Sequence, residues 1–244
     1  MTICDAHCHV GEGSLKNQSV EKLLANMDRN GVEKAVIVPV EEYLAVKNEE
    51  GNSYILELCN RYPDRFWGFA TANPWFGEKA LKMLRYFLSG GLRGLKFNST
   101  VQGFKINDAL IYPFMELAEE FKAPVYFHTG TPVCAMPFQL HELAGRYPGV
   151  RFIMGHCGYS DFWQDIPFIV AHSENIWFDT SLSMTSRTEA ILDLGGSGRV
   201  LFGSDSPRSN LEYEIRKVKL CRAEQKDIEA IMGANLVTLL GGPV

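Results

Sequence analysis

Short apolar runs alternate with longer amphipathic runs along the whole chain of 244 residues, and this alternation limits the folds that are open to it. Eight short runs rich in β-branched and aromatic residues are typical of strands. They recur roughly every 30 residues, as in a chain built from repeated strand–helix units. The predicted strands cover residues 3–10, 34–40, 65–74, 93–99, 124–130, 151–158, 175–181 and 199–206.

The segments between these strands have the spacing of amphipathic helices, for example 19–31, 78–91 and 110–122. Glycines and Tyr-Pro pairs stand where several of them should stop. The last region, from about 210 to 240, also reads as helical, with a break near Gly233.

Eight strands, each followed by a helix, predict an α/β fold of the (β/α)8 TIM-barrel type, whose usual length is about 250 residues. A doubly wound open sheet is the alternative. Continuously apolar runs such as 34–40 fit strands that are buried on both faces. No linker or shift in composition divides the chain, so we expect a single domain over residues 1–244.

Composition and charge exclude several classes of partner. The apolar content of 46% is ordinary for a globular protein, and a net charge of −5 offers no basic footprint for nucleic acid or for a membrane surface. No apolar run has the length of a membrane span, and the first 15 residues lack the layout of a signal peptide. Six cysteines without a CxxC pair fit reduced thiols, so we expect a cytoplasmic protein.

Polar side chains collect at the ends of the predicted strands. In a barrel the carboxyl ends of all strands meet at one face, where active sites lie. Four of the six histidines stand at such ends, whereas His141 and His172 fall in predicted helices and are expected to be structural or solvated. The strand-end set is His7, His9, Lys96, Asn98, His128, His156 and Asp205.

Alternation along the first strand predicts how its side chains point. His7 and His9 are two residues apart and should share a face, with Cys8 on the opposite face beneath a helix. Asp5 should lie on the histidine face, one step deeper. A buried carboxylate is costly unless it is paired, so we expect Asp5 to support the site rather than bind at it.

Two histidines at i and i+2 on one strand can chelate a metal ion, although a single pair is a weak signal. The convergence of His128, His156 and Asp205 on the same face favours a metal site over hydrogen-bonded core histidines. Nitrogen and carboxylate ligands suit zinc, and also manganese, iron or cobalt.

Five segments resemble the amidohydrolase superfamily: DAHCHV, RGLKF, FHTG, MGHCG and FGSDSP. More narrowly, they resemble the amidohydrolase-related branch that includes aminocarboxymuconate-semialdehyde decarboxylase and several lactone hydrolases. The likeness covers nearly the whole chain. Near the C-terminus, MGANLVTLLG resembles the closing Gly-Asn-Ala helix of the branch, with Leu236 in place of the Ala.

The resemblance implies that His7, His9, His128 and Asp205 bind one divalent ion, for which we favour Zn2+. His156 would lie beside them, as a ligand of a second ion or as a hydrogen-bonding catalytic residue. The resemblance also suggests a homodimer.

Lys96 leaves three interpretations open. It could be carboxylated and bridge two metal ions, as a lysine does in other branches of the superfamily. It could be a cation that binds a substrate carboxylate, or an ammonium group paired with Asp5 or Asp205. The bridge is the least favoured of the three.

These residues predict a metal-dependent hydrolase that attacks a lactone, ester or amide of a small molecule with an activated water. Asp205 would take the proton from the water and return it to the leaving group, and His156 would help to polarise the carbonyl. The compact chain favours hydrolysis over the alternative, decarboxylation of an unsaturated or aromatic acid. A metabolite-binding barrel without catalysis is the second alternative.

Residues just beyond the strand ends are candidates for contact with the substrate. Arg208 follows Asp205 by three residues and has the planar fork that suits a carboxylate. The other candidates are Asn73, Trp75, Asn98 and Tyr159.

Overall fold

The computed structural model of the protein describes residues 1–159 and 162–241. Within this part of the chain, nine strands form one sheet in the order β2-β1-β3-β4-β5-β6-β7-β8-β9. β2 is antiparallel to β1, and all the remaining neighbouring pairs are parallel. The strands are β1 (Ile3–Glu12), β2 (Asn17–Gln18), β3 (Val32–Pro39), β4 (Phe66–Ala70), β5 (Gly94–Phe97), β6 (Val125–Phe127), β7 (Phe152–Met154), β8 (Ile176–Asp179) and β9 (Val200–Leu201).

The chain that follows β9 pairs with β1 and closes the sheet into a barrel. The Asp205 amide donates to the His7 carbonyl at 2.8 Å, and Cys8 and Ser206 form a parallel bridge. The predicted (β/α)8 barrel is therefore confirmed, with β1 and β3 to β9 as its eight parallel strands. The alternative of a doubly wound sheet is wrong, because the strand order never reverses and the first and last barrel strands are joined.

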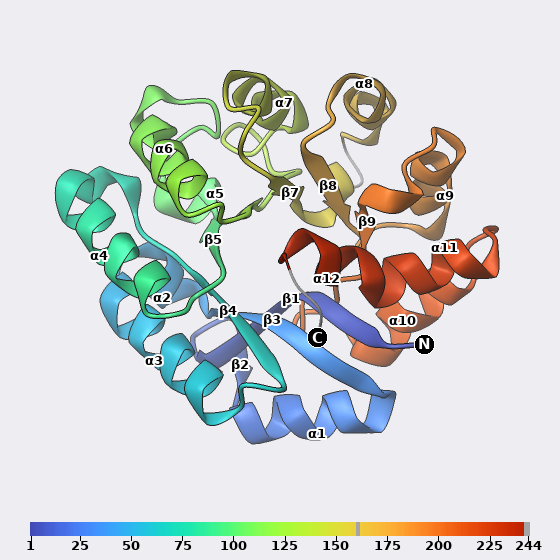
Figure 1. The fold of residues 1–244 in the computed structure, drawn as a ribbon, viewed down its shortest axis with the longest axis horizontal. Coiled ribbons are helices and arrows are strands. Elements are labelled where there is room, and N and C mark those ends of the chain that lie inside the picture. Colours follow the sequence, from blue (N-terminus) through green and yellow to red (C-terminus); the bar gives the residue numbers. More distant parts are fainter. Residues whose placement is uncertain (160–161, 242–244) are drawn as a thin grey trace.

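Helices surround these strands on the outside of the ring (Figure 1). Their bounds agree with the predicted segments to within a few residues. The helices are α1 (Val20–Asn30), α2 (Glu41–Ala45), α3 (Asn48–Arg61), α4 (Gly77–Ser89), α5 (Ser99–Gln102), α6 (Tyr112–Glu120), α7 (Pro137–Arg146), α8 (Ile166–His172), α9 (Thr185–Asp193), α10 (Leu211–Lys219), α11 (Gln225–Glu229) and α12 (Asn235–Leu239).

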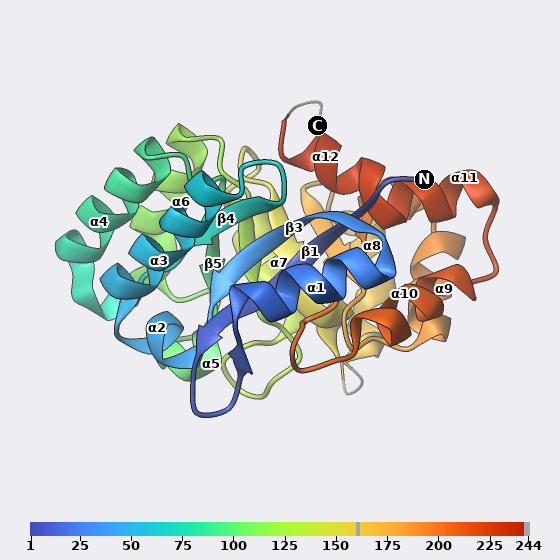
Figure 2. The same ribbon diagram turned by 90° about the horizontal axis from the view of Figure 1, so that it is seen from below.

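The last helices differ from the expected pattern at one point. Instead of a break near Gly233, a π-helical turn over Ala230–Ala234 joins α11 to α12 without interruption. The turn lies against β1, so the C-terminal helix reaches the barrel and does not stand apart from it. Figure 2 shows α12 at the same end of the molecule as the N-terminus.

Two apolar cores hold the barrel together. One lies inside it, where side chains such as Val36, Phe69 and Ile153 pack together and Leu236 of α12 joins them. The larger core lies between the strands and the surrounding helices and includes Phe97. With the inside filled by apolar side chains and α12 at the N-terminal end, the polar residues of the strands are left to the opposite end.

A bulge in β1 changes which way its side chains point. Asp5 is paired with Ala35 and Cys8 with Ile37, so three steps on β1 match two on β3. The prediction that Asp5 shares the histidine face is therefore wrong, because the extra residue reverses the alternation between Asp5 and His7. Cys8 belongs to the outer core as expected, and its thiol donates to Asp5 Oδ2 at 3.0 Å.

Two further expectations concern the chain as a whole. All six cysteines have free thiols, and Cys4, Cys8, Cys157 and Cys221 are buried. Among the helices of the described residues, none has both the length and the apolar character that a membrane span requires.

Candidate metal centre

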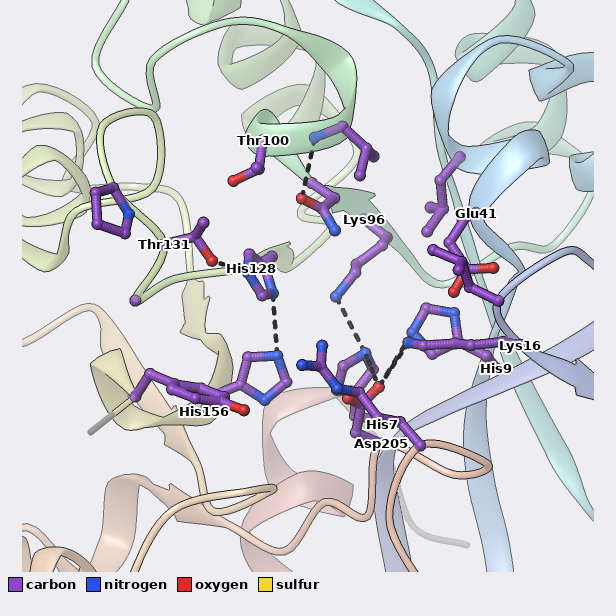
Figure 3. A pocket seen from close by; sticks show the side chains of 18 residues that line it. His7, His9, Lys16, Glu41, Lys96, Thr100, His128, Thr131, His156 and Asp205 are labelled. Carbon is purple, nitrogen blue, oxygen red and sulfur yellow. Dashed lines mark hydrogen bonds and ion pairs between the residues drawn. The ribbon is translucent and has the colours of Figure 1, made fainter. Parts of the chain in front are cut away.

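Many polar side chains surround a cavity of about 420 Å³ at the carboxyl ends of the strands. This volume is in the range of small-molecule sites. The cavity is lined by all the strand-end residues that the sequence singled out, namely His7, His9, Lys96, Asn98, His128, His156 and Asp205 (Figure 3).

His7, His9 and Asp205 form the tightest group of ligand atoms in this cavity. One ligand atom from each lies within 4.8 Å of the others, and all three side chains are buried. Asp205 Oδ1 is 3.3 Å from His9 Nε2 and 3.7 Å from His7 Nε2. Asp205 Oδ2 is buried with no hydrogen-bond partner in the described chain. Two imidazoles and a carboxylate with an unused oxygen are a donor set that fits a divalent metal ion.

The surroundings of His9 determine which of its nitrogens is free to bind. His9 Nδ1 lies 3.0 Å from the carbonyl oxygen of Pro39. Because a carbonyl can only accept, Nδ1 carries the proton and Nε2 presents its lone pair to Asp205 and the cavity. A backbone carbonyl that orients a histidine in this way is a common support for a metal ligand.

Burial keeps the site histidines neutral. Loss of hydration lowers the pKa of His7, His9, His128 and His156, that of His9 to about 4. For Asp205, burial acts to raise the pKa, but the interactions with His7 and His9 outweigh it and hold the pKa well below its usual range. At neutral pH the group therefore offers unprotonated imidazoles and a carboxylate, the forms that bind a metal.

Two of the site residues have an unusual backbone. Asp205 has φ of 51° and His156 has φ of 61°, in the left-handed region that residues other than glycine rarely adopt. Both stand where a strand has just ended and the chain turns sharply. Such conformations are costly and cluster at functional sites, where they aim a side chain.

His128 takes a different position from His7, His9 and Asp205. Its Nδ1 is 3.1 Å from His156 Nε2, and its Nε2 is 2.8 Å from the Thr131 hydroxyl. In the described residues, no compact group of ligand atoms includes His128. Its part in metal binding stays a prediction from the resemblance.

Lys96 lies deep in the cavity. Its Nζ is 3.1 Å from His7 Nε2 and 3.5 Å from the centre of the Tyr126 ring. Burial lowers the pKa of Lys96 well below its usual value. The pairing of Lys96 with Asp5 is wrong, since the bulge turns Asp5 to the other face. Asp205 Oδ1 accepts a hydrogen bond from Lys16 instead, at 2.9 Å.

The sequence reasoning missed Lys16, Glu41 and Asp179. Lys16 lines the cavity from the loop between β1 and β2, which has no strand-end pattern, whereas Glu41 is the first residue of α2, just after β3. Asp179 ends β8, so the strand-end rule applied to it as well as to Asp205. It is buried at the base of the site, where the interactions of its carboxylate with His7, His156 and Ser181 outweigh burial and lower the pKa of the carboxyl group.

The candidates for substrate contact divide into two sets. Asn98, Tyr159 and Arg208 line the cavity, and their contact with a substrate stays a prediction. Asn73 and Trp75 are not among the cavity-lining residues of the described chain. Asn73 caps the short helical turn that follows β4, and the exposed Trp75 donates its indole N–H to the Gly103 carbonyl. The loop after β4 turns both side chains away from the mouth.

Comparison with known proteins agrees with this description. A sequence model described as Amidohydrolase matches residues 4–241. A γ-resorcylate decarboxylase from Rhodococcus jostii is 22% identical over 285 aligned positions, covering 92% of this chain and 84% of the relative.

Solved structures share the fold over almost the full length. A 5-carboxyvanillate decarboxylase from Sphingomonas paucimobilis superposes with a TM-score of 0.82 at 14% identity, covering 99% of both chains. A dihydroxybenzoic acid decarboxylase from a Polaromonas species has a TM-score of 0.78 at 18% identity, covering 98% of this chain and 96% of that one. That structure holds manganese and the inhibitor 2-nitroresorcinol.

The expectation of a hydrolase is wrong. It rested on the compactness of the chain, yet a decarboxylase relative aligns with this chain over 84% of its own length. A compact barrel is therefore compatible with decarboxylation. The preference for zinc also lacks specific support, because the related fold just described binds manganese.

Proposed function

The chain belongs to the amidohydrolase family, and from this premise we propose that it is a metal-dependent decarboxylase of a small aromatic or unsaturated carboxylic acid. The observation that carries the proposal is the group of His7, His9 and Asp205 at the base of the cavity. The decarboxylase relatives, which match over most of their length, support the reaction type.

His7, His9 and Asp205 would hold the metal ion, with His128 as a fourth candidate ligand. Manganese and zinc are both suited to nitrogen and carboxylate donors. When bound, the ion supplies positive charge that anchors the carboxylate of the substrate. His128 is turned toward His156 and Thr131, so its participation requires that the Thr131 hydroxyl bond be released.

The remaining polar residues of the cavity would orient the acid. Arg208 offers a planar guanidinium that can bind a carboxylate or a phenolate through two parallel hydrogen bonds. Lys16 adds positive charge, the Lys96 amine can donate hydrogen bonds, and Leu15, Leu44 and Val101 provide an apolar wall for a ring or a diene. This combination suits an acid with a flat apolar body.

We assign proton transfer to Asp205. Its Oδ1 contacts His9 and Lys16, whereas Oδ2 has no hydrogen-bond partner among the described residues. Because Asp205 is ionised at neutral pH, Oδ2 would first take up a proton from solvent and then pass it to the carbon that bears the carboxyl group. As the new C–H bond forms, the bond to the carboxyl group breaks and its electron pair returns to the ring or diene. One proton is consumed and one molecule of carbon dioxide is released.

The direct test measures carbon dioxide from a panel of acids with protein loaded with Mn2+ or Zn2+. The panel includes γ-resorcylate, 5-carboxyvanillate and 2-amino-3-carboxymuconate-6-semialdehyde, the acids in the names of the relatives. Release from at least one acid is expected, and it should be lost when the metal is removed. Failure of every acid to release carbon dioxide from fully loaded protein would sink the proposal. Tight binding of an acid without turnover would instead support a metabolite-binding barrel.

The role of Asp205 is tested separately. Asp205→Asn keeps an oxygen for the metal but removes the proton carrier, so turnover should fall by at least about 100-fold in protein that still contains metal. His172→Asn, which changes an exposed histidine of α8 outside the cavity, is the control and should leave turnover unchanged. Full turnover in metal-loaded Asp205→Asn would contradict the assignment.

A further inference from the structure

Asp179 receives four hydrogen bonds below the cavity, although it does not line the cavity itself. Its Oδ2 accepts from the Tyr126 hydroxyl at 2.6 Å, from the Ser181 hydroxyl at 2.5 Å and from the His156 amide at 3.3 Å. Its Oδ1 accepts from the Ser181 amide at 3.0 Å. The two hydroxyl groups each have a second contact, and these contacts lead to two different histidines of the site.

The first branch leads to the ligand His7. A tyrosine hydroxyl has one proton, and Tyr126 gives it to the carboxylate of Asp179. The Tyr126 oxygen can then only accept, and His7 Nδ1 lies 2.8 Å from it. His7 Nδ1 therefore carries the ring proton, and Nε2 is left with the lone pair that faces Asp205. This is the tautomer that a metal ligand of this geometry needs.

The second branch leads to His156. The Ser181 hydroxyl also gives its proton to Asp179, and His156 Nδ1 lies 2.9 Å from the Ser181 oxygen. The same nitrogen is 3.3 Å from the Ser181 carbonyl, which can only accept. His156 Nδ1 is therefore protonated as well, and it is held by two acceptors. His7 Nδ1 has one acceptor at hydrogen-bond distance, the Tyr126 oxygen, while Asp179 Oδ2 lies farther away, at 3.6 Å.

Two glycines let the backbone approach this network closely. A Cβ atom built on Gly203 would lie 1.9 Å from Asp179 Oδ1, and one built on Gly155 would lie 2.5 Å from the Tyr126 hydroxyl. A larger residue at either position would have to displace Asp179 or Tyr126.

His7, His156 and Asp179 also satisfy the distance criterion for a metal group, with ligand atoms within 4.8 Å. Their facing atoms are already engaged, however. Asp179 Oδ2 has three donors, and Nδ1 of each histidine has an acceptor. The group is a hydrogen-bonded network and not a second cation site.

We propose that Asp179 is a positioning residue that, through the Tyr126 hydroxyl, sets the tautomer and orientation of His7 for metal binding, while the Ser181 branch orients His156. The expected effect of Asp179 on turnover rests on the decarboxylase activity proposed above. The expected effect of Asp179 on the His7 tautomer and on metal affinity does not depend on any substrate.

Two conservative variants separate the branches. Tyr126→Phe removes the acceptor of His7 Nδ1 and leaves the ring in place, so affinity for Mn2+ should fall by about 10- to 100-fold. Ser181→Ala is the matched control, because it removes a hydroxyl bound to the same carboxylate that contacts His156 instead of His7. Its affinity for Mn2+ should stay within about twofold of the natural protein. Competition with a chromogenic chelator measures both values.

The tautomers are read directly by long-range 1H–15N NMR on metal-free protein labelled at its six histidines. In Tyr126→Phe, the His7 signals should shift toward a mixture of tautomers, while those of His156 stay unchanged. Asp179→Asn should affect His7 as well, and if it fails to fold, the two conservative variants still decide the question. Unfolding in urea shows that both variants remain folded.

Two results would overturn the proposal. One is a Tyr126→Phe variant with the natural His7 tautomer and natural Mn2+ affinity. The other is a Ser181→Ala variant that loses as much affinity as Tyr126→Phe, which would mean that the network only maintains structure. If no acid is decarboxylated but the tautomers and affinities behave as described, this proposal stands and the proposed function falls.

Discussion

Replacing Asp5 by Asn should change how stability depends on pH. Asp5 is fully buried on the outer face of β1, and burial raises the pKa of its carboxyl group from 3.8 to about 7. Asn fits the same contacts. Its oxygen can accept from the His7 and Ser204 amides, which lie 2.9 Å from Asp5 Oδ1, and its NH2 group can donate to the Cys8 sulfur. The substitution thus removes a buried charge and keeps the packing.

The size of the effect follows from the two pKa values. Because the pKa is higher in the folded state, the folded protein binds the proton more tightly, and stability is lost as the pH rises from about 4 to about 7. A shift from 3.8 to about 7 corresponds to roughly 4 kcal/mol over the whole range. Between pH 5 and pH 8, ionisation of Asp5 should lower the free energy of unfolding of the natural protein by roughly 2.5 kcal/mol. The Asp5→Asn variant should not show this loss.

The assay is urea unfolding followed by tryptophan fluorescence at pH 5, 6, 7 and 8. The quantity of interest is the free energy of unfolding of the variant minus that of the natural protein, since the other titrating groups are common to both. This difference should grow with pH in favour of Asn and level off above about pH 7. Asp193→Asn, at an exposed position at the end of α9, serves as control because it removes no buried charge. A difference for Asp5→Asn that stays level from pH 5 to pH 8 would refute the reasoning.

Four further predictions concern the site and its support. Chelation of the metal should abolish the release of carbon dioxide, and added Mn2+ should restore it in a coupled assay. Affinity for Mn2+ should be nearly constant from pH 8 to pH 6 and should fall only as the pH approaches the pKa of His9, about 4. Above that pH, His9 has no extra proton to lose before it binds the metal. Competition with a chelator at each pH measures the affinity. Gly203→Ala should destabilise the fold by about 1–3 kcal/mol in urea unfolding, because its Cβ would collide with Asp179. Gly145→Ala lies in open space within α7 and should stabilise the fold by up to about 1 kcal/mol. Arg208→Lys should raise KM for the acid about tenfold and leave Mn2+ affinity unchanged, because lysine lacks the planar fork; equal changes in both would contradict this role.

Much of the barrel and part of the site could be read from the sequence. The repeated alternation of strand and helix predicts the barrel because a short, fully apolar strand must be covered on both faces. His7, His9 and Asp205 stand at predicted strand ends in the sequence. This predicts that they lie close together, because the carboxyl ends of parallel strands share one face of a barrel. These inferences depend only on local periodicity and on the topology that follows from it.

The reaction type was the point at which local reasoning failed. The residues that hold a metal and move a proton are compatible with hydrolysis and with decarboxylation, because both need an anchored carbonyl or carboxyl group and a nearby acid or base. The length of the chain did not separate them. Similarity to decarboxylases over most of the chain favours decarboxylation.

The tertiary structure alone decided the supports of the site. One extra residue in β1 turned Asp5 away from His7, because alternation is a rule of period two that a single bulge reverses. Asp179, Tyr126 and His7 lie on three strands far apart in the sequence, and their hydrogen bonds depend on the register of those strands around the barrel. Local sequence patterns predict the face of a strand from which a side chain projects. The residue to which that side chain hydrogen-bonds is determined by the packing of segments that are distant in the sequence.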